Sequence, residues 1–163
     1  MYLIFLSLAI LIAYLTFSLK VIGIPYSISD TYYQLKKANE PYWLFQVCMV
    51  FSAGILLPAW VEMIEDTSYT CCAFLACVGL IFVGMAPSFK LELEGKVHIG
   101  GTIICGLASV LYMIFSGYYY IPLILLPFVL SLIFKYKKPM FWIELYLFLS
   151  TYLSLIINSI TKL

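Results

Sequence analysis

The sequence predicts an all-α integral membrane protein: a six-transmembrane-helix bundle with a short interfacial helix in the first loop. Two observations support this class. The 163 residues are 64% hydrophobic and only 10% charged, with a mean hydropathy of +1.06, whereas soluble domains carry about 25% charged residues. Apolar runs also recur along the whole chain, each near the roughly 20 residues that a helix needs to cross a bilayer.

Six apolar runs account for most of the chain. The predicted spans cover residues 2–19, 43–61, 69–89, 97–116, 118–134 and 140–160. Their hydrophobicity is continuous rather than alternating, which favours helices over strands in lipid. The connections are short, so we expect residues 1–163 to form a single transmembrane domain. The break between the fourth and fifth runs is the weakest, and five longer helices are the alternative.

The lysines give the predicted orientation. The first run lacks the basic start and cleavage site of a signal peptide, so we expect it to remain as a span. Eight lysines fall in the first, third and fifth loops, and only Lys162 falls on the other side. The positive-inside rule therefore places loops 1, 3 and 5 in the cytoplasm and both termini outside.

Small residues in the spans predict how the helices pack. Gly101, Cys105 and Ser109 recur at four-residue steps, a pattern that lets membrane helices approach closely. We therefore expect the fourth span to be central. The five cysteines lie within predicted spans without CxxC spacing, so they predict packing rather than a metal site or cofactor. They are Cys48, Cys71, Cys72, Cys77 and Cys105.

The first loop reads IPYSISDTYYQL and carries helix-start chemistry. Ser27 is followed three residues later by Asp30, which matches a capping box, and Asn39 supplies a stop. Tyr32 and Tyr33 give the helix an aromatic side, so we expect it to lie in the membrane interface.

The third loop brings a second polar cluster to the same side of the membrane. It holds Glu94 and the single histidine, His98. Because half-buried polar groups need partners, we expect Ser29 or Asp30 of the first loop to hydrogen-bond to His98. One histidine cannot build a multi-histidine zinc site, so no metal is predicted.

Three motifs carry a family resemblance. PYSISDT, GLIFVGMAPSF and VHIGG, in this order, resemble the damage-regulated autophagy modulators and the related Frag and Sfk proteins. The resemblance implies six spans, a role in lipid handling or membrane organisation, and a shared site. That site maps to Ser29, Asp30, Phe89 and His98. The chain departs from the family pattern at Tyr32 and Ser88, and its lysine bias gives the opposite orientation.

A polar stripe follows the sixth predicted span and should face protein. It consists of Glu144, Thr151, Ser154 and Asn158. Glu144 lies near the surface, where we expect it to pair with a lysine of residues 135–138. A proton or ion path is the alternative.

Three functions remain open from the sequence. The favoured interpretation is a non-catalytic protein that binds a lipid headgroup or a membrane protein partner at the polar cluster of loops 1 and 3. The alternatives are a lipid-modifying enzyme using His98 with Asp30 or Glu94, and a small transporter. Membrane lipids are the expected partners, and nucleic acid is not expected.

Overall fold

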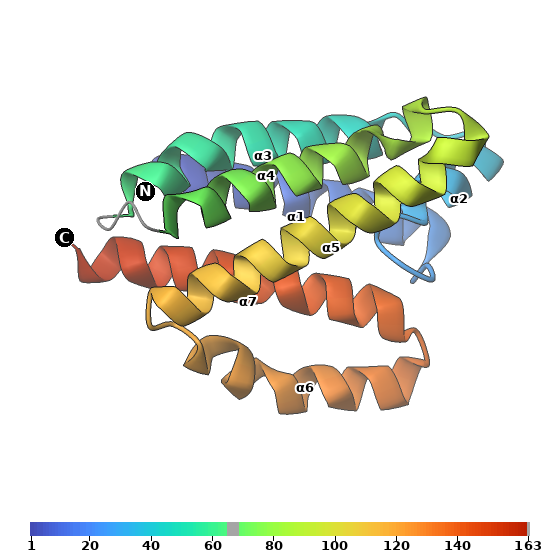
Figure 1. The fold of residues 1–163 in the computed structure, drawn as a ribbon. Coiled ribbons are helices and arrows are strands. Elements are labelled where there is room, and N and C mark those ends of the chain that lie inside the picture. Colours follow the sequence, from blue (N-terminus) through green and yellow to red (C-terminus); the bar gives the residue numbers. More distant parts are fainter. Residues whose placement is uncertain (65–68, 163) are drawn as a thin grey trace.

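The computed structural model describes residues 1–64 and 69–162, and every regular element in these ranges is helical. The elements are α1 (Tyr2–Ile22), α2 (Thr31–Lys37), α3 (Leu44–Glu62), α4 (Thr70–Met85), η2 (Ala86–Ser88), α5 (Leu91–Phe115), α6 (Tyr120–Tyr136) and α7 (Pro139–Thr161) (Figure 1). The all-helical class predicted from the sequence is confirmed.

Five of these helices are long and apolar enough to cross a membrane: α1, α3, α4 extended by η2, α5 and α7. The apolar helix α6 has 17 residues, which give a length of about 25 Å and place it at the lower limit for a span. A multi-pass membrane protein is therefore confirmed, whereas the count of six spans stays a prediction.

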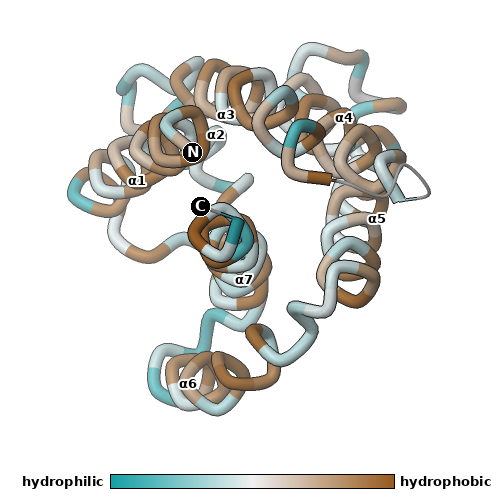
Figure 2. The backbone as a smooth tube through the Cα atoms, turned by 90° about the vertical axis from the view of Figure 1, so that its left-hand side faces the viewer, coloured by the Kyte–Doolittle hydropathy of each residue, from teal (hydrophilic) through white to brown (hydrophobic). Residues whose placement is uncertain are grey.

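The helices form a curved row around α7. In an end-on view, α1, α3, α4 and α5 follow one another along the row, α7 lies inside the curve, and α6 packs on the outer side of α7 (Figure 2). The expectation that the fourth span would be central is wrong. That span is α5, which ends the row and exposes Ile103, Leu107 and Leu111.

The small residues of α5 do pack closely, as predicted, but against α4. A Cβ atom added at Gly79 would lie 2.7 Å from the backbone N of Cys105 and 2.7 Å from the carbonyl O of Gly101. Only hydrogen fits at such a separation, so the two helices touch backbone to backbone. Small residues thus mark a close contact, and they do not show whether a helix lies at the centre of a bundle.

One predicted helix boundary is wrong. Helix α5 begins at Leu91, whereas its span was predicted to begin at Val97, so Glu92 and Glu94 lie in its first turn. Carboxylates are favourable at a helix N-terminus, so the helix can begin before the apolar run. The charged side chains limit how deeply the helix enters the membrane, but they do not limit the length of the helix. The predicted break after α5 is present, where Gly117 has a φ of 81°.

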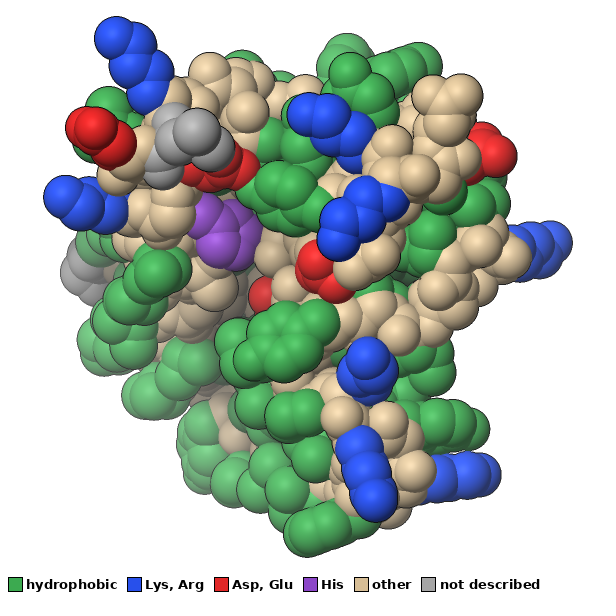
Figure 3. All heavy atoms as spheres, turned by 90° about the vertical axis from the view of Figure 1, so that its right-hand side faces the viewer, with side chains coloured by type: hydrophobic (Ala, Val, Ile, Leu, Met, Phe, Trp, Pro, Cys, Tyr) green, Lys and Arg blue, Asp and Glu red, His purple; other side chains and the backbone are tan. Residues whose placement is uncertain are grey.

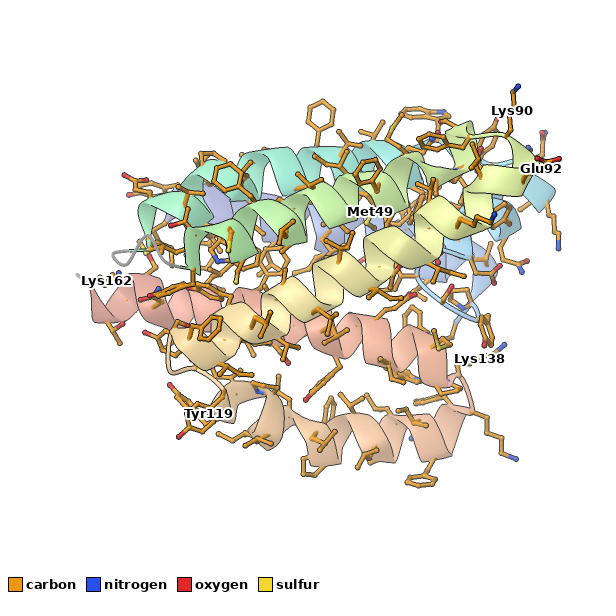
Figure 4. All side chains as sticks on the ribbon, in the orientation of Figure 1. Met49, Lys90, Glu92, Tyr119, Lys138 and Lys162 are labelled. Atoms are coloured by element: carbon orange, nitrogen blue, oxygen red, sulfur yellow. The ribbon has the colours of Figure 1, made fainter. Side chains whose placement is uncertain are left out.

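The first, third and fifth loops lie at one end of the bundle, and both termini lie at the other (Figure 1). Both termini are at one end, and the other end holds the first loop with α2, the α4–α5 turn and the α6–α7 turn (Figure 1). Figure 4 labels Lys90, Glu92 and Lys138 at the loop end and Tyr119 and Lys162 at the terminal end. We call the loop-bearing end the loop end.

Candidate functional site

The first loop folds into a turn and a short helix. The Asp30 N–H donates to Ser27 Oγ at 3.1 Å, and Asp30 Oδ2 accepts from the Tyr26 N–H at 3.3 Å. Ser27 therefore makes one bond of the predicted capping box, whereas the Asp30 carboxylate bonds to Tyr26 in place of Ser27, and α2 begins only at Thr31. The helix ends as predicted near Asn39, whose φ is 59°.

Helix α2 is held inside the protein more than the sequence predicted. Thr31 and Leu35 are fully buried, and the Thr31 hydroxyl hydrogen-bonds to that of Tyr14 in α1. Tyr32 is buried edge-on against Phe45 of α3. Only Tyr33 of the predicted aromatic side is exposed. The interfacial helix thus packs against α1 and α3, which fixes the first loop in place.

A cavity of about 490 Å³ opens at the loop end, and we call it the outer cavity. Its walls come from the first loop, α2, the start of α3, η2 and the first turns of α5. The lining residues are Tyr26, Ser27, Ser29, Asp30, Tyr33, Phe45, Pro87, Glu94, Gly95, His98 and Ile99. Four of the predicted site residues are therefore brought together, namely Ser29, Asp30, Glu94 and His98. The fifth, Phe89, is exposed and lies outside the lining.

The polar groups of the outer cavity are bonded differently from the prediction. Among the described residues, His98 forms no hydrogen bond with Ser29 or Asp30, and its imidazole donates instead to the backbone carbonyl of Val83 in α4. The first loop reaches α5 through the Tyr33 hydroxyl, which donates to Glu94 Oε1. The expected direct bond is wrong because the cavity itself separates the two segments.

The charged side chains that line the outer cavity are acidic. They are the carboxylates of Asp30 and Glu94, and none of the lining residues is a lysine. The space-filling view of this end shows the histidine, acidic side chains both centrally and at the edges, and lysines distributed over the face (Figure 3). A cation is therefore favoured inside the cavity.

Glu144 of α7 ties the last helix to the first loop. Its Oε2 accepts from the Ile28 N–H at 2.5 Å, and the Phe141 N–H donates to the Tyr26 carbonyl at 3.0 Å. The predicted pairing of Glu144 with a lysine of residues 135–138 is wrong. A backbone donor is the partner because the first loop, rather than the α6–α7 turn, passes over this carboxylate.

The rest of the polar stripe faces protein, as predicted. Thr151 and Ser154 donate to backbone carbonyls of their own helix, at 2.8 and 2.7 Å. Asn158 Nδ2 donates to the Tyr112 hydroxyl at 3.1 Å, and its Oδ1 accepts from the Tyr118 hydroxyl at 3.3 Å. Asn158 therefore joins α7 to α5 and to the turn that precedes α6.

A second cavity, of about 80 Å³, lies in the interior, and we call it the inner cavity. It runs between α3, α4, α5 and α7, with Glu144 at the loop end and Trp60 toward the opposite end. The further lining residues are Ile28, Ser29, Phe45, Met49, Leu56, Ala76, Cys77, Leu80, Val83, Thr102, Cys105, Gly106, Ser109, Leu147, Phe148, Thr151 and Tyr152. Ser29 and Phe45 line both cavities, so the two cavities are neighbours at these residues.

Metal-type ligands do not gather within the described ranges. No group of three or more His, Cys, Asp or Glu side chains there could hold a metal ion. The five cysteines are free: Cys48, Cys72 and Cys77 are buried, Cys105 is partly buried and Cys71 is exposed. The groups available for chemistry are therefore the hydroxyls, two carboxylates and imidazole of the outer cavity.

The chain is thus an all-helical, multi-pass membrane protein with a polar cavity at one end that adjoins an apolar cavity inside. Comparison with known proteins adds no relative: no family model, curated protein or solved structure matches it. The resemblance to the autophagy-modulator family stays a prediction.

Proposed function

We propose that this protein binds the headgroup of a membrane lipid in the outer cavity. The observation that carries the proposal is the cavity itself, which has about 490 Å³ of space at the end of an apolar bundle. Its walls carry hydroxyl, carboxylate and imidazole groups, and ligand sites generally combine such a few polar groups with apolar walls. Membrane lipids are the most abundant molecules that reach this place.

The charges favour a headgroup that carries an ammonium group. Asp30 and Glu94 provide negative charge inside the outer cavity, and Tyr26 and Tyr33 add aromatic rings to its wall. Carboxylates and aromatic faces both attract ammonium ions. Exposed lysines of the loop end, such as Lys90 (Figure 4), suit the phosphate of a zwitterionic headgroup.

The proposal includes the placement of the chain in the membrane. In it, α6 crosses the bilayer as the sixth span, and both termini lie on the side opposite the loop end. The lysine bias assigns the loop end to the cytoplasm. The lipid bound in the outer cavity then comes from the cytoplasmic leaflet.

Lipid analysis of the purified protein tests this function. The protein is placed in nanodiscs of mixed choline, ethanolamine, serine and glycerol phospholipids, and the lipids that remain bound are counted by native mass spectrometry. We expect enrichment of lipids with choline or ethanolamine heads over the nanodisc composition. Glu94→Gln removes one charge from the cavity wall and should reduce this enrichment.

Glu92→Gln is the matched control, because Glu92 lies in the same turn of α5 but outside the cavity lining. It should leave the bound lipids unchanged. Retained lipids that match the nanodisc composition in the unaltered protein would refute the proposal. Copurification of one membrane protein without lipid enrichment would favour the alternative partner.

A further inference from the structure

We propose that the inner cavity holds one hydrocarbon chain of the lipid whose headgroup occupies the outer cavity. This inference rests on the proposed function and extends it from the headgroup to the chain. The outer cavity at the loop end has polar walls, and the inner cavity next to it has mainly apolar walls. A lipid has the same order, with a polar headgroup followed by a hydrocarbon chain. Ser29 and Phe45, which line both cavities, lie where headgroup and chain would join.

The inner cavity has the width of a single chain. Its lining runs from Thr102 to Ser109 on α5 and from Glu144 to Tyr152 on α7, about 10 to 12 Å, and from Phe45 to Trp60 on α3, about 22 Å. A volume of about 80 Å³ for the centre of a water-sized sphere, spread over a length of about 10 to 22 Å, describes a tube about 5 to 6 Å wide. Carbon atoms in contact lie about 3.5 to 4.0 Å apart, so one chain fits and two chains side by side do not.

The length of the inner cavity sets how much of the chain it covers. A fully staggered hydrocarbon chain advances about 1.25 Å per carbon. The cavity therefore accommodates at least about eight carbons, and up to about 18 along α3, counted from Ser29. The terminal half of such a segment reaches toward Leu56 and Trp60, which line the cavity farthest along α3.

Water is a poor occupant of this space. A buried water needs two to four polar partners. Near Met49 of α3 and Leu80 of α4, the lining side chains are mainly aliphatic, aromatic and thiol groups. An empty cavity would leave those walls without dispersion contacts. A chain gains little by leaving the equally apolar bilayer, so its gain here comes from packing, and the headgroup contacts select which lipid enters.

Fluorescence quenching from within the cavity tests the inference. Trp60 is 2% exposed and lines the inner cavity, so lipids around the protein have poor access to it. Replacing Trp43 and Trp142 with Phe leaves Trp60 as the single tryptophan. The protein is then placed in nanodiscs of choline phospholipid with bromine either near the middle of the chain or next to the ester.

We expect bromine about eight to ten carbons from the ester to quench Trp60 much more than bromine next to the ester. Gly106→Leu should abolish this difference, because the added side chain fills the inner cavity at a position whose nearest neighbour is Leu147. Gly100→Leu is the matched control on the same helix. Gly100 has no neighbour within 4 Å and lies outside both linings, so the difference should persist.

Equal quenching by the two lipids, or a difference that survives Gly106→Leu, would overturn the inference. The comparison of the two brominated lipids needs no cavity variant, so it stands even if Gly106→Leu fails to fold. Failure of the proposed function is read separately, as an absence of headgroup enrichment in mass spectrometry. Enriched choline heads with no positional quenching would therefore overturn the chain site and leave the headgroup site intact.

Discussion

From the contact between α4 and α5 we predict that adding a methyl group at Gly79 destabilises the protein. In Gly79→Ala the new Cβ would lie 2.7 Å from two backbone atoms, Cys105 N and Gly101 O. Backbone atoms in a helix cannot turn aside as a flexible side chain can, so the helices must separate. Overpacking of this kind costs about 1 to 3 kcal/mol, and here it acts at the most extensive helix contact of the bundle.

The control for this variant is Gly54→Ala in α3, where the added Cβ meets nothing within 4 Å. Both variants gain the same helix propensity, up to about 1 kcal/mol, so the difference between them isolates the contact. We expect Gly79→Ala to be less stable than Gly54→Ala by about 1 to 3 kcal/mol. The assay is reversible unfolding by dodecyl sulfate in mixed micelles, followed by circular dichroism. Equal stability of the two variants would refute the backbone contact.

Two further predictions concern the first loop and the orientation of the chain. Glu144→Leu leaves the Ile28 N–H without its acceptor, which should lower the free energy of unfolding by about 1 to 3 kcal/mol and speed hydrogen exchange at Ile28. Glu144→Gln keeps an acceptor and should restore protection of the Ile28 amide. Unchanged exchange at Ile28 in the Leu variant would contradict the contact. Single cysteines at Lys36 and Lys137, in a cysteine-free background, should resist an impermeant thiol reagent in intact cells, whereas one at Tyr119 should react. The opposite labelling pattern would reverse the orientation taken from the lysine bias.

The helices could be predicted from the sequence because each depends on local composition. Apolar runs of bilayer length gave the long helices, and Gly117 with its positive φ marked the turn after α5. The close contact of Gly101 and Cys105 was also predictable, because small residues at four-residue steps lie on one helix face. The position of α5 at the end of the row was not predictable, because a pattern of small residues does not show which helix packs against it.

The candidate site could be predicted only in part. The residues Ser29, Asp30, Glu94 and His98 do line one cavity, since polar groups in a membrane protein gather where loops share a side. Their bonds depend on the tertiary structure. The Tyr33 hydroxyl donates to a carboxylate 61 residues away, and no local pattern could have paired these two residues.

The two cavities could not be predicted at all, because a cavity is a space between helices rather than a property of any of them. Glu144 was predicted near the membrane surface on its helix, but its acceptor role toward the Ile28 N–H was not. Carboxylates near several lysines suggest ion pairs from the sequence alone. In the folded protein, the Ile28 N–H of the first loop lies next to Glu144 and donates to its carboxylate.

The bond between Glu144 and Ile28 also has a consequence for biosynthesis. The two residues are 116 positions apart, and at about 5 to 20 residues per second a ribosome needs roughly 6 to 23 s to add that stretch. During this interval α1 and the first loop are already made, but α7, which supplies the Glu144 carboxylate, does not yet exist. The inner cavity, which α7 lines, therefore cannot form until α7 has been made.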